Sequence, residues 1–139
     1  LLKFLFIFLI LNDKYENIEL CEYIYDMPLK MAAADLTINR AGAMTISELA
    51  ITGKPAIFIP SPNVAENHQY HNAMTLKRCG AAEVIEEKEL TGDRLIETVS
   101  NLIENKPKLK KMSECAKKHA IEDANERIYE VIMQLYTGA

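Results

Sequence analysis

The segment with the most residues that could bind a ligand runs from Asn39 to Glu48, where small residues surround Gly42 and a helical pattern begins. A glycine at such a turn lets a ligand approach the backbone closely. The first amides of a helix lack internal partners and carry partial positive charge, which suits a diphosphate. The Glu48 carboxylate, about one turn further on, can accept hydrogen bonds from both hydroxyls of a ribose. Alternatively, Thr45 and Glu48 have the spacing of a capping box, in which Glu48 only bonds back to the Thr45 amide.

A second polar segment, residues 67–72, follows a proline-containing loop and enters another helical pattern. His68 and Gln69 are expected to point from the helix start toward the same crevice as Gly42. The amide of Gln69 offers both a donor and an acceptor to sugar hydroxyls. In the alternative interpretation, Asn67 caps the helix and the residues after it form a solvated first turn.

A third segment, residues 23–27, places Ile24 at the end of an expected strand, where backbone groups can read the edge of a base. Its alternative is a simple strand-to-helix turn capped by Asp26. His68 and His71 lack the ligand set of a metal site, so no metal is expected. Six lysines form a basic stretch that is interpreted as solvated helix faces, with weak attraction to an anionic membrane as the alternative: Lys106, Lys108, Lys110, Lys111, Lys117 and Lys118.

The elements that must position these segments alternate between strands and helices. Strands are expected at 18–24, 36–39, 56–59 and 82–85, and helices at 27–34, 45–52, 69–79, 93–105, from Pro107 onward, and 124–136. This alternation predicts the α/β class, with a parallel sheet flanked by helices. Ligands of such sheets bind beyond the carboxyl ends of the strands. The loops at 24–27, 40–45 and 61–69 are therefore the expected site.

Composition narrows the class of protein further. The 139 residues are 49% hydrophobic and 26% charged, typical of a globular domain with a sizeable core. A net charge of −4 argues against a nucleic-acid partner. The three separated cysteines, Cys21, Cys79 and Cys115, fit buried thiols in a reducing compartment. The apolar run from Phe4 to Leu11 is shorter than the ~20 residues of a membrane helix and is interpreted as a buried strand or short core helix.

Several of these segments together resemble the MurG family of N-acetylglucosaminyltransferases, the C-terminal, donor-binding domain of glycosyltransferase family 28. The resemblance covers residues 16–136. It is carried, in order, by Tyr23-Ile24-Tyr25-Asp26-Met27, Ala32-Ala33-Ala34-Asp35-Leu36, the segment from Arg40 to Glu48, Gly53-Lys54-Pro55-Ala56, Pro60, His68-Gln69-Tyr70-His71-Asn72-Ala73, Gly80-Ala81-Ala82 and Asp123-Ala124. Several motifs in register are more specific than any one alone.

The resemblance implies a Rossmann-like domain of the GT-B fold that binds UDP-N-acetylglucosamine without a metal or other cofactor. The backbone of Ile24 corresponds to the contact with uracil. The helix start that follows Gly42, at Ala43, Met44 and Thr45, corresponds to the diphosphate site. Glu48 corresponds to the ribose ligand and Gln69 to a ligand of the sugar hydroxyls. His68 departs from the double-glutamine form of some members, which leaves its role open.

The resemblance also has a boundary. Residues 1–15 lack the glycine-rich first loop of the family, so residues 16–139 are expected to form a partial donor domain. The acceptor-binding domain, with the proposed catalytic base, is not recognised in the chain, which begins without a methionine and is interpreted as a piece of a longer protein. Catalytic residues are therefore unassigned, and the chain alone is expected to be inactive.

In the whole enzyme, the family's reaction transfers N-acetylglucosamine to lipid-linked N-acetylmuramoyl-pentapeptide for peptidoglycan synthesis. It is expected at the cytoplasmic face of the membrane, with the enzyme bound peripherally. Two rival functions remain: the donor domain of another UDP-sugar transferase that needs a partner chain, and a non-catalytic nucleotide-sugar-binding module.

Overall fold

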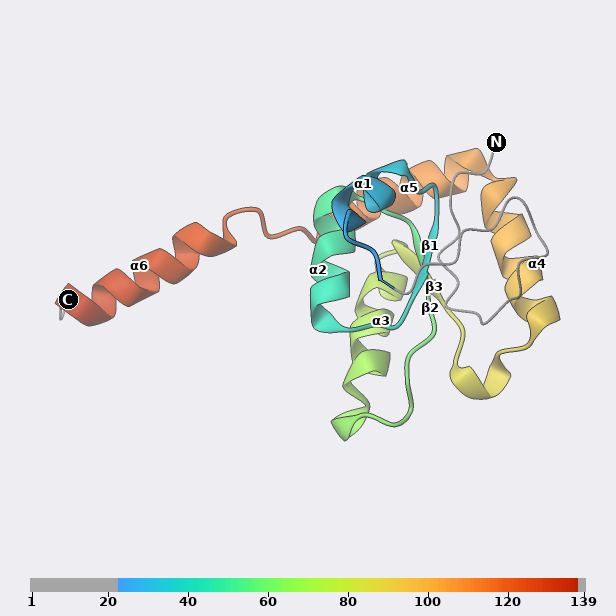
Figure 1. Ribbon diagram of the computed structural model, residues 1–139, viewed down its shortest axis with the longest axis horizontal. Coiled ribbons are helices and arrows are strands. Elements are labelled where there is room, and N and C mark those ends of the chain that lie inside the picture. Colours follow the sequence, from blue (N-terminus) through green and yellow to red (C-terminus); the bar gives the residue numbers. More distant parts are fainter. Residues whose placement is uncertain (1–22, 138–139) are drawn as a thin grey trace.

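Within residues 23–137, three short parallel strands form the sheet that organises the molecule (Figure 1). The computed structural model describes residues 23–137. The strands are β1 (Thr37–Asn39), β2 (Ala56–Phe58) and β3 (Ala82–Val84), in that spatial order. Ile57 lies opposite Ile38 on one side and Glu83 on the other. The wholly buried β2 is central, as its apolar sequence predicts.

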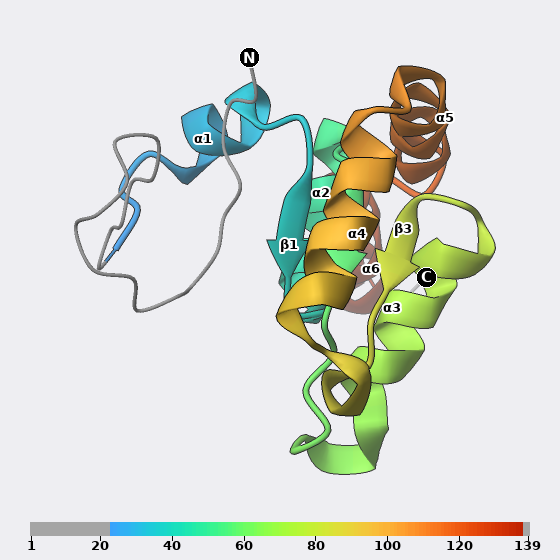
Figure 2. The same ribbon diagram turned by 90° about the vertical axis from the view of Figure 1, so that its right-hand side faces the viewer.

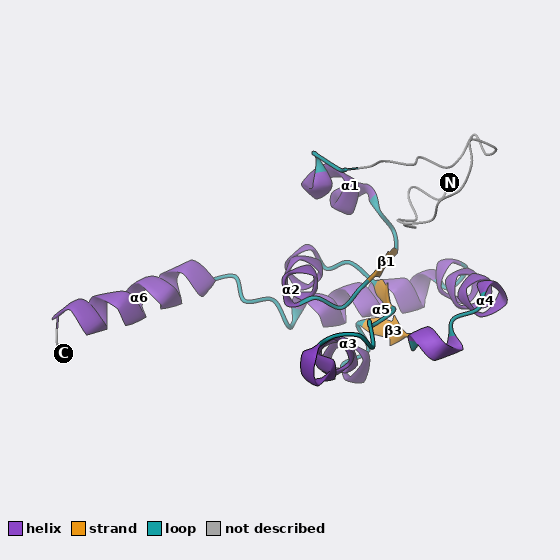
Figure 3. Cartoon of the chain, turned by 60° about the horizontal axis from the view of Figure 1, so that its bottom comes forward, coloured by secondary structure: helices purple, strands orange, loops and turns teal. Residues whose placement is uncertain are grey.

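Helices cover both faces of this sheet. They are α1 (Met27–Ala33), α2 (Ala43–Thr52), α3 (His68–Arg78), α4 (Gly92–Ile103), α5 (Lys106–Lys117) and α6 (Ala124–Thr137), with short 3₁₀ turns η1 (Ala65–Asn67) and η2 (Glu87–Glu89). Figure 3 shows α2 and α3 on one side of the strands and α4 on the other. This arrangement confirms the predicted α/β class with helices flanking a parallel sheet.

The core divides at the sheet because neighbouring residues of β2 point to opposite faces. Phe58 packs with Leu49 of α2 and Leu76 of α3. Ile57 packs with Leu102 of α4 and Met112 of α5 on the other face. The first cluster holds α2 and α3 against one face of the sheet, and the second holds α4 and α5 against the other.

Glycines end two of the helices where the sequence predicts. Gly53, after α2, is left-handed, with φ 63° and ψ 39°, and its amide donates to the carbonyl of Ala50 at 3.1 Å. Gly80 follows α3 with φ 79°. Both positions require a backbone conformation that other residues adopt only with strain.

The observed elements differ from the prediction at several ends. α2 begins at Ala43 rather than Thr45, and β1 begins at Thr37. Tyr23 and Ile24 are irregular, whereas the sequence predicted that they end a strand. The rest of that strand, the apolar run at 4–11 and Cys21 lie outside the described residues.

The last helix stands apart from the body of the molecule. α6 projects away from the sheet and its covering helices (Figure 1), and every residue from 121 to 137 is exposed. Its exposed apolar residues include Ile128, Ile132 and Leu135, which share one face. Within residues 23–137, no helix has the length and apolar character needed to cross a membrane.

Candidate functional site

The turn between β1 and α2 ends in a helix start whose amides point outward without partners. Gly42 is the N-cap residue, has extended backbone and provides no side-chain cap. The first α2 amide with a partner is that of Ile46, which donates to the Gly42 carbonyl at 3.0 Å. The amides of Ala43, Met44 and Thr45 precede it and have no acceptor among the residues the structure describes. Three unpaired donors at the positive end of a helix are an arrangement that favours an anion.

Gly42 is not needed for the conformation of this turn. Its φ of −67° is open to any residue. A Cβ built on it would approach only the Thr45 Oγ1, at 3.9 Å, which is ordinary van der Waals contact. The space beside the Gly42 Cα is therefore open, and a side chain there would occupy it.

Glu48 does not take part in a capping box. The hypothesis needed Thr45 at the N-cap, but Gly42 holds that position and Thr45 is the third residue of α2. Glu48 is exposed, and its carboxylate has no partner within residues 23–137. Side chains of a helix tilt toward its N-terminus, so this carboxylate leans toward the orphan amides.

The loop between β2 and α3 brings a second group of polar side chains to the same edge of the sheet. Two left-handed residues, Glu66 and Asn67, both with φ 52°, turn the chain into α3. Asn67 is the N-cap residue, but its side chain makes no capping bond, so the expected side-chain cap is wrong. Non-glycine residues in this conformation are uncommon and concentrate at functional loops.

Gln69 and His68 begin α3 in different environments. The half-buried Gln69 accepts a hydrogen bond on Oε1 from the amide of Ser61, at 2.9 Å. His68 is exposed, and its Nδ1 lies 2.9 Å from the carbonyl oxygen of Ala65. Gln69 thus fastens the loop after β2 to α3, while the amide group at its tip keeps two N–H donors for a ligand.

Two further side chains, which the sequence analysis did not single out, brace the strand ends. Asn72 Nδ2 of α3 donates to the carbonyl of Ala41 at 3.2 Å, in the turn before α2. The Arg40 guanidinium donates to the carbonyl of Ile59 at 3.1 Å and pairs with the Glu87 carboxylate. These bonds tie the chain segments after β1, β2 and β3 together. No pattern in the sequence indicates these bonds.

Asn39 ends β1 with a buried polar atom. Its Nδ2 is inaccessible to solvent and has no hydrogen-bond partner in the described part of the chain. A buried donor without an acceptor costs about 1–3 kcal/mol. Asn39 lies just before the turn that carries the orphan amides. Proteins usually retain such unfavourable groups at functional sites.

The structure does not bring every predicted residue together. Ile24 belongs to the segment before α1, and Figure 2 shows α1 on the far side of β1 from α3. Asp26 is the N-cap residue of α1, but its side chain makes no capping bond. No group of three metal-ligating side chains occurs within residues 23–137.

The fold and this edge of the sheet together define a class of protein. Parallel strands with helix starts at their carboxyl ends, and unpaired amides at one of those starts, are features of an α/β domain of the kind that binds nucleotides at this edge. The neighbouring amide and imidazole side chains add partners for hydroxyl groups.

The chain belongs to glycosyltransferase family 28, whose C-terminal domain it matches over residues 6–128. It is 50% identical, over 122 residues, to the UDP-N-acetylglucosamine--N-acetylmuramyl-(pentapeptide) pyrophosphoryl-undecaprenol N-acetylglucosamine transferase of Acetivibrio thermocellus. That alignment covers 88% of this chain and 33% of the relative. The protein of the same name from Ruminiclostridium cellulolyticum is 46% identical over 126 residues, covering 90% of this chain and 35% of the relative.

A solved structure has the same fold. The crystal structure of MurG from Acinetobacter baumannii superposes with a TM-score of 0.79 at 33% identity, covering 85% of this chain and 34% of that one. This match confirms the expected GT-B type of Rossmann-like domain. The chain spans about a third of the length of the curated relatives it matches.

Proposed function

We propose that the chain is the donor-binding part of a glycosyltransferase that uses UDP-N-acetylglucosamine. The observation that carries the proposal is the start of α2, where three amides lack partners within residues 23–137 and the exposed Glu48 follows in the next turn. The amides of Ala43, Met44 and Thr45 bind the diphosphate. Glu48 accepts hydrogen bonds from the ribose hydroxyls, and Gln69 and His68 contact the sugar.

The chemical task of this part is to stabilise a leaving group. Transfer of the sugar breaks the bond between its anomeric carbon and the diphosphate, so negative charge accumulates on departing UDP. A helix start acts on that charge without having to reorganise, which is the usual advantage of fixed dipoles. The braces through Arg40 and Asn72 keep the turn before α2 in place while the charge develops.

The acceptor and the cellular place extend the proposal to the whole protein. The names of the relatives support transfer to lipid-linked N-acetylmuramoyl-pentapeptide in peptidoglycan synthesis. Because that acceptor is anchored in a membrane, we place the full protein peripherally at the cytoplasmic face. The acceptor-binding half and the catalytic base belong to the part of the relatives that this chain does not cover.

The proposal is tested by titrating uridine, UDP and UDP-N-acetylglucosamine into the chain and following amide NMR shifts. We expect UDP to bind at least ~10-fold more tightly than uridine, because hydrogen bonds to a charged group contribute about 1.5–3 kcal/mol each. The largest shifts should fall on Ala43, Met44 and Thr45. Equal affinity for uridine and UDP would exclude the start of α2 as the diphosphate site.

A second experiment addresses turnover. The chain alone should transfer no sugar to a lipid-linked acceptor, because both substrates must be held in register for reaction. The matched measurement uses a full-length relative under identical conditions. Appreciable transfer by the 139-residue chain would overturn the assignment of acceptor binding to another part of the protein.

A further inference from the structure

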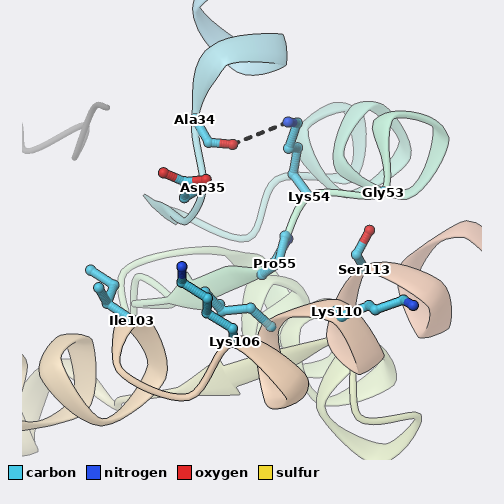
Figure 4. Close-up of a pocket in the computed structure, with 10 residues that line it drawn as sticks. Ala34, Asp35, Gly53, Lys54, Pro55, Ile103, Lys106, Lys110 and Ser113 are labelled. Carbon is cyan, nitrogen blue, oxygen red and sulfur yellow. Dashed lines mark hydrogen bonds between the residues drawn. The ribbon is translucent and has the colours of Figure 1, made fainter. Parts of the chain in front are cut away.

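A cavity lies at the opposite edge of the sheet from the candidate nucleotide site. It has a volume of about 570 Å³ and is walled by Asp35 just before β1, Lys54 and Pro55 just before β2, and one side of α5 (Figure 4). It therefore opens where the parallel strands begin, whereas the orphan amides lie where they end. Nothing in the proposed transfer reaction uses it.

Lysines dominate the charge of this cavity. Lys54, Lys106 and Lys110 line it against a single carboxylate, that of Asp35, which forms no salt bridge within residues 23–137. In Figure 4, Asp35 and Lys54 lie on one wall and Lys106 and Lys110 on the facing wall. The Lys54 ammonium is held by the carbonyls of Ala32 and Ala34, at 2.8 and 3.1 Å.

The lysines of α5 occupy an electrostatically unfavourable position. Four of the first six residues of α5 are lysines and no acidic residue lies in its first turn. Cations at the positive end of a helix are destabilising, where anions would be favoured. Among these four, Lys108 is paired with the Glu83 carboxylate at 2.8 Å. Lys106 and Lys110, which line the cavity, have no carboxylate within salt-bridge distance in the described part of the protein.

An anion in the cavity would resolve this local conflict. It would lie among Lys54, Lys106 and Lys110 and near the hydroxyl of Ser113. In Figure 4 the ammonium groups of Lys106 and Lys110 point in different directions, so an anion contacts both only after one of these exposed side chains changes its rotamer. Lysine is a compact point charge suited to phosphate. Ile103 and Leu109 contribute apolar surface to the same cavity. A volume of about 570 Å³ exceeds the size of one phosphate group, which leaves room for an organic portion against that surface.

We infer that this cavity binds a phosphate ester, with Lys106 and Lys110 as its principal ligands. The sequence indicated solvated helix faces for all six lysines of this stretch; Lys106 and Lys110 are exposed and also line a common cavity. The same phosphate chemistry occurs in a soluble ester and in the headgroup of an anionic phospholipid. The experiment therefore includes one probe of each kind.

The first probe is glycerol phosphate, titrated by NMR. The second is phosphatidylglycerol vesicles, whose binding is measured by sedimentation and compared with that of phosphatidylcholine vesicles. The cavity variant is Lys106→Gln with Lys110→Gln. The matched control is Lys111→Gln with Lys118→Gln, which removes the same charge from exposed positions outside the cavity. All four side chains are exposed, so both variants should fold, and circular dichroism checks this. The two single variants of the cavity pair provide a second measurement.

We expect the cavity variant to bind at least tenfold more weakly and the control variant to change less than threefold. Binding of glycerol phosphate identifies a soluble ester, and binding of phosphatidylglycerol vesicles alone identifies a headgroup. Equal losses in both variants, or failure of the wild-type chain to bind either probe, would overturn the inference. UDP affinity should be unchanged in the cavity variant, so a negative result here leaves the proposed donor site untouched.

Discussion

Replacement of Glu48 by glutamine separates binding from folding at the start of α2. The carboxylate is exposed, has no partner within residues 23–137, and lies outside the first turn of its helix. Glutamine has the same size and a similar helix propensity. Surface substitutions of this kind usually change stability by less than about 0.5 kcal/mol. The free energy of unfolding of Glu48→Gln should therefore be close to that of the wild-type chain.

The expected effect on UDP is larger. A carboxylate that receives both ribose hydroxyls makes charge-assisted bonds, which are about twice as strong as neutral ones. Hydrogen bonds to charged groups contribute roughly 1.5–3 kcal/mol. A loss in that range weakens UDP binding by a factor of about 10 to 160.

The assay is calorimetric titration of UDP, with urea unfolding measured on the same preparation. Glu97→Gln, on an exposed position of α4, is the matched control and should change neither quantity. The comparison should be repeated in a full-length relative, where the second half of the cleft is present. Normal UDP affinity in Glu48→Gln would show that Glu48 is not the ribose ligand. Early unfolding with normal affinity would mean that Glu48 serves only the helix.

Three further predictions concern other positions. Gly42→Val should reduce UDP affinity at least ~10-fold while costing under about 1 kcal/mol of unfolding free energy, the scale of a changed N-cap; unchanged affinity in a UDP titration would remove Gly42 from the site. Gly53→Ala should destabilise by more than about 1 kcal/mol in urea unfolding, because its φ is 63° and the new Cβ would meet the Lys117 side chain. The hydrogen bond from Arg127 holds the pKa of Asp123 below its usual value. NMR titration should therefore show Asp123 becoming protonated at a lower pH than an ordinary aspartate. Its ion pair with Arg127 breaks as the pH falls through that pKa. Arg127→Gln should raise the pH at which Asp123 is half protonated.

Much of the fold could be predicted because local signals and packing agree. The apolar residues at 56–58 form the central strand, and Gly53 and Gly80 end helices through left-handed backbone. The amphipathic stripe of α4 faces the sheet through Leu102. At these places the local preference of the chain and its tertiary environment favour the same conformation.

The site was less predictable because its details depend on residues far apart in the chain. The start of α2 at Ala43 removed the capping box at Thr45, although the spacing favoured it. Gln69 turns to the Ser61 amide, and Asn72 reaches the Ala41 carbonyl 31 positions earlier. Such bonds follow from how strand ends meet in space, and no sequence pattern indicates them.

The isolation of α6 has a thermodynamic consequence. A helix of 14 residues with no buried side chain is supported by its own backbone bonds and by exposed local contacts such as the ion pair of Arg127 with Asp123. Nucleation makes isolated helices shorter than about 12–15 residues marginal in water. Residues 124–137 should therefore exchange their amide hydrogens far faster than those of β2. Any surface that covers Ile128 and Ile132 would slow this exchange, so the exchange rate of this segment measures docking directly.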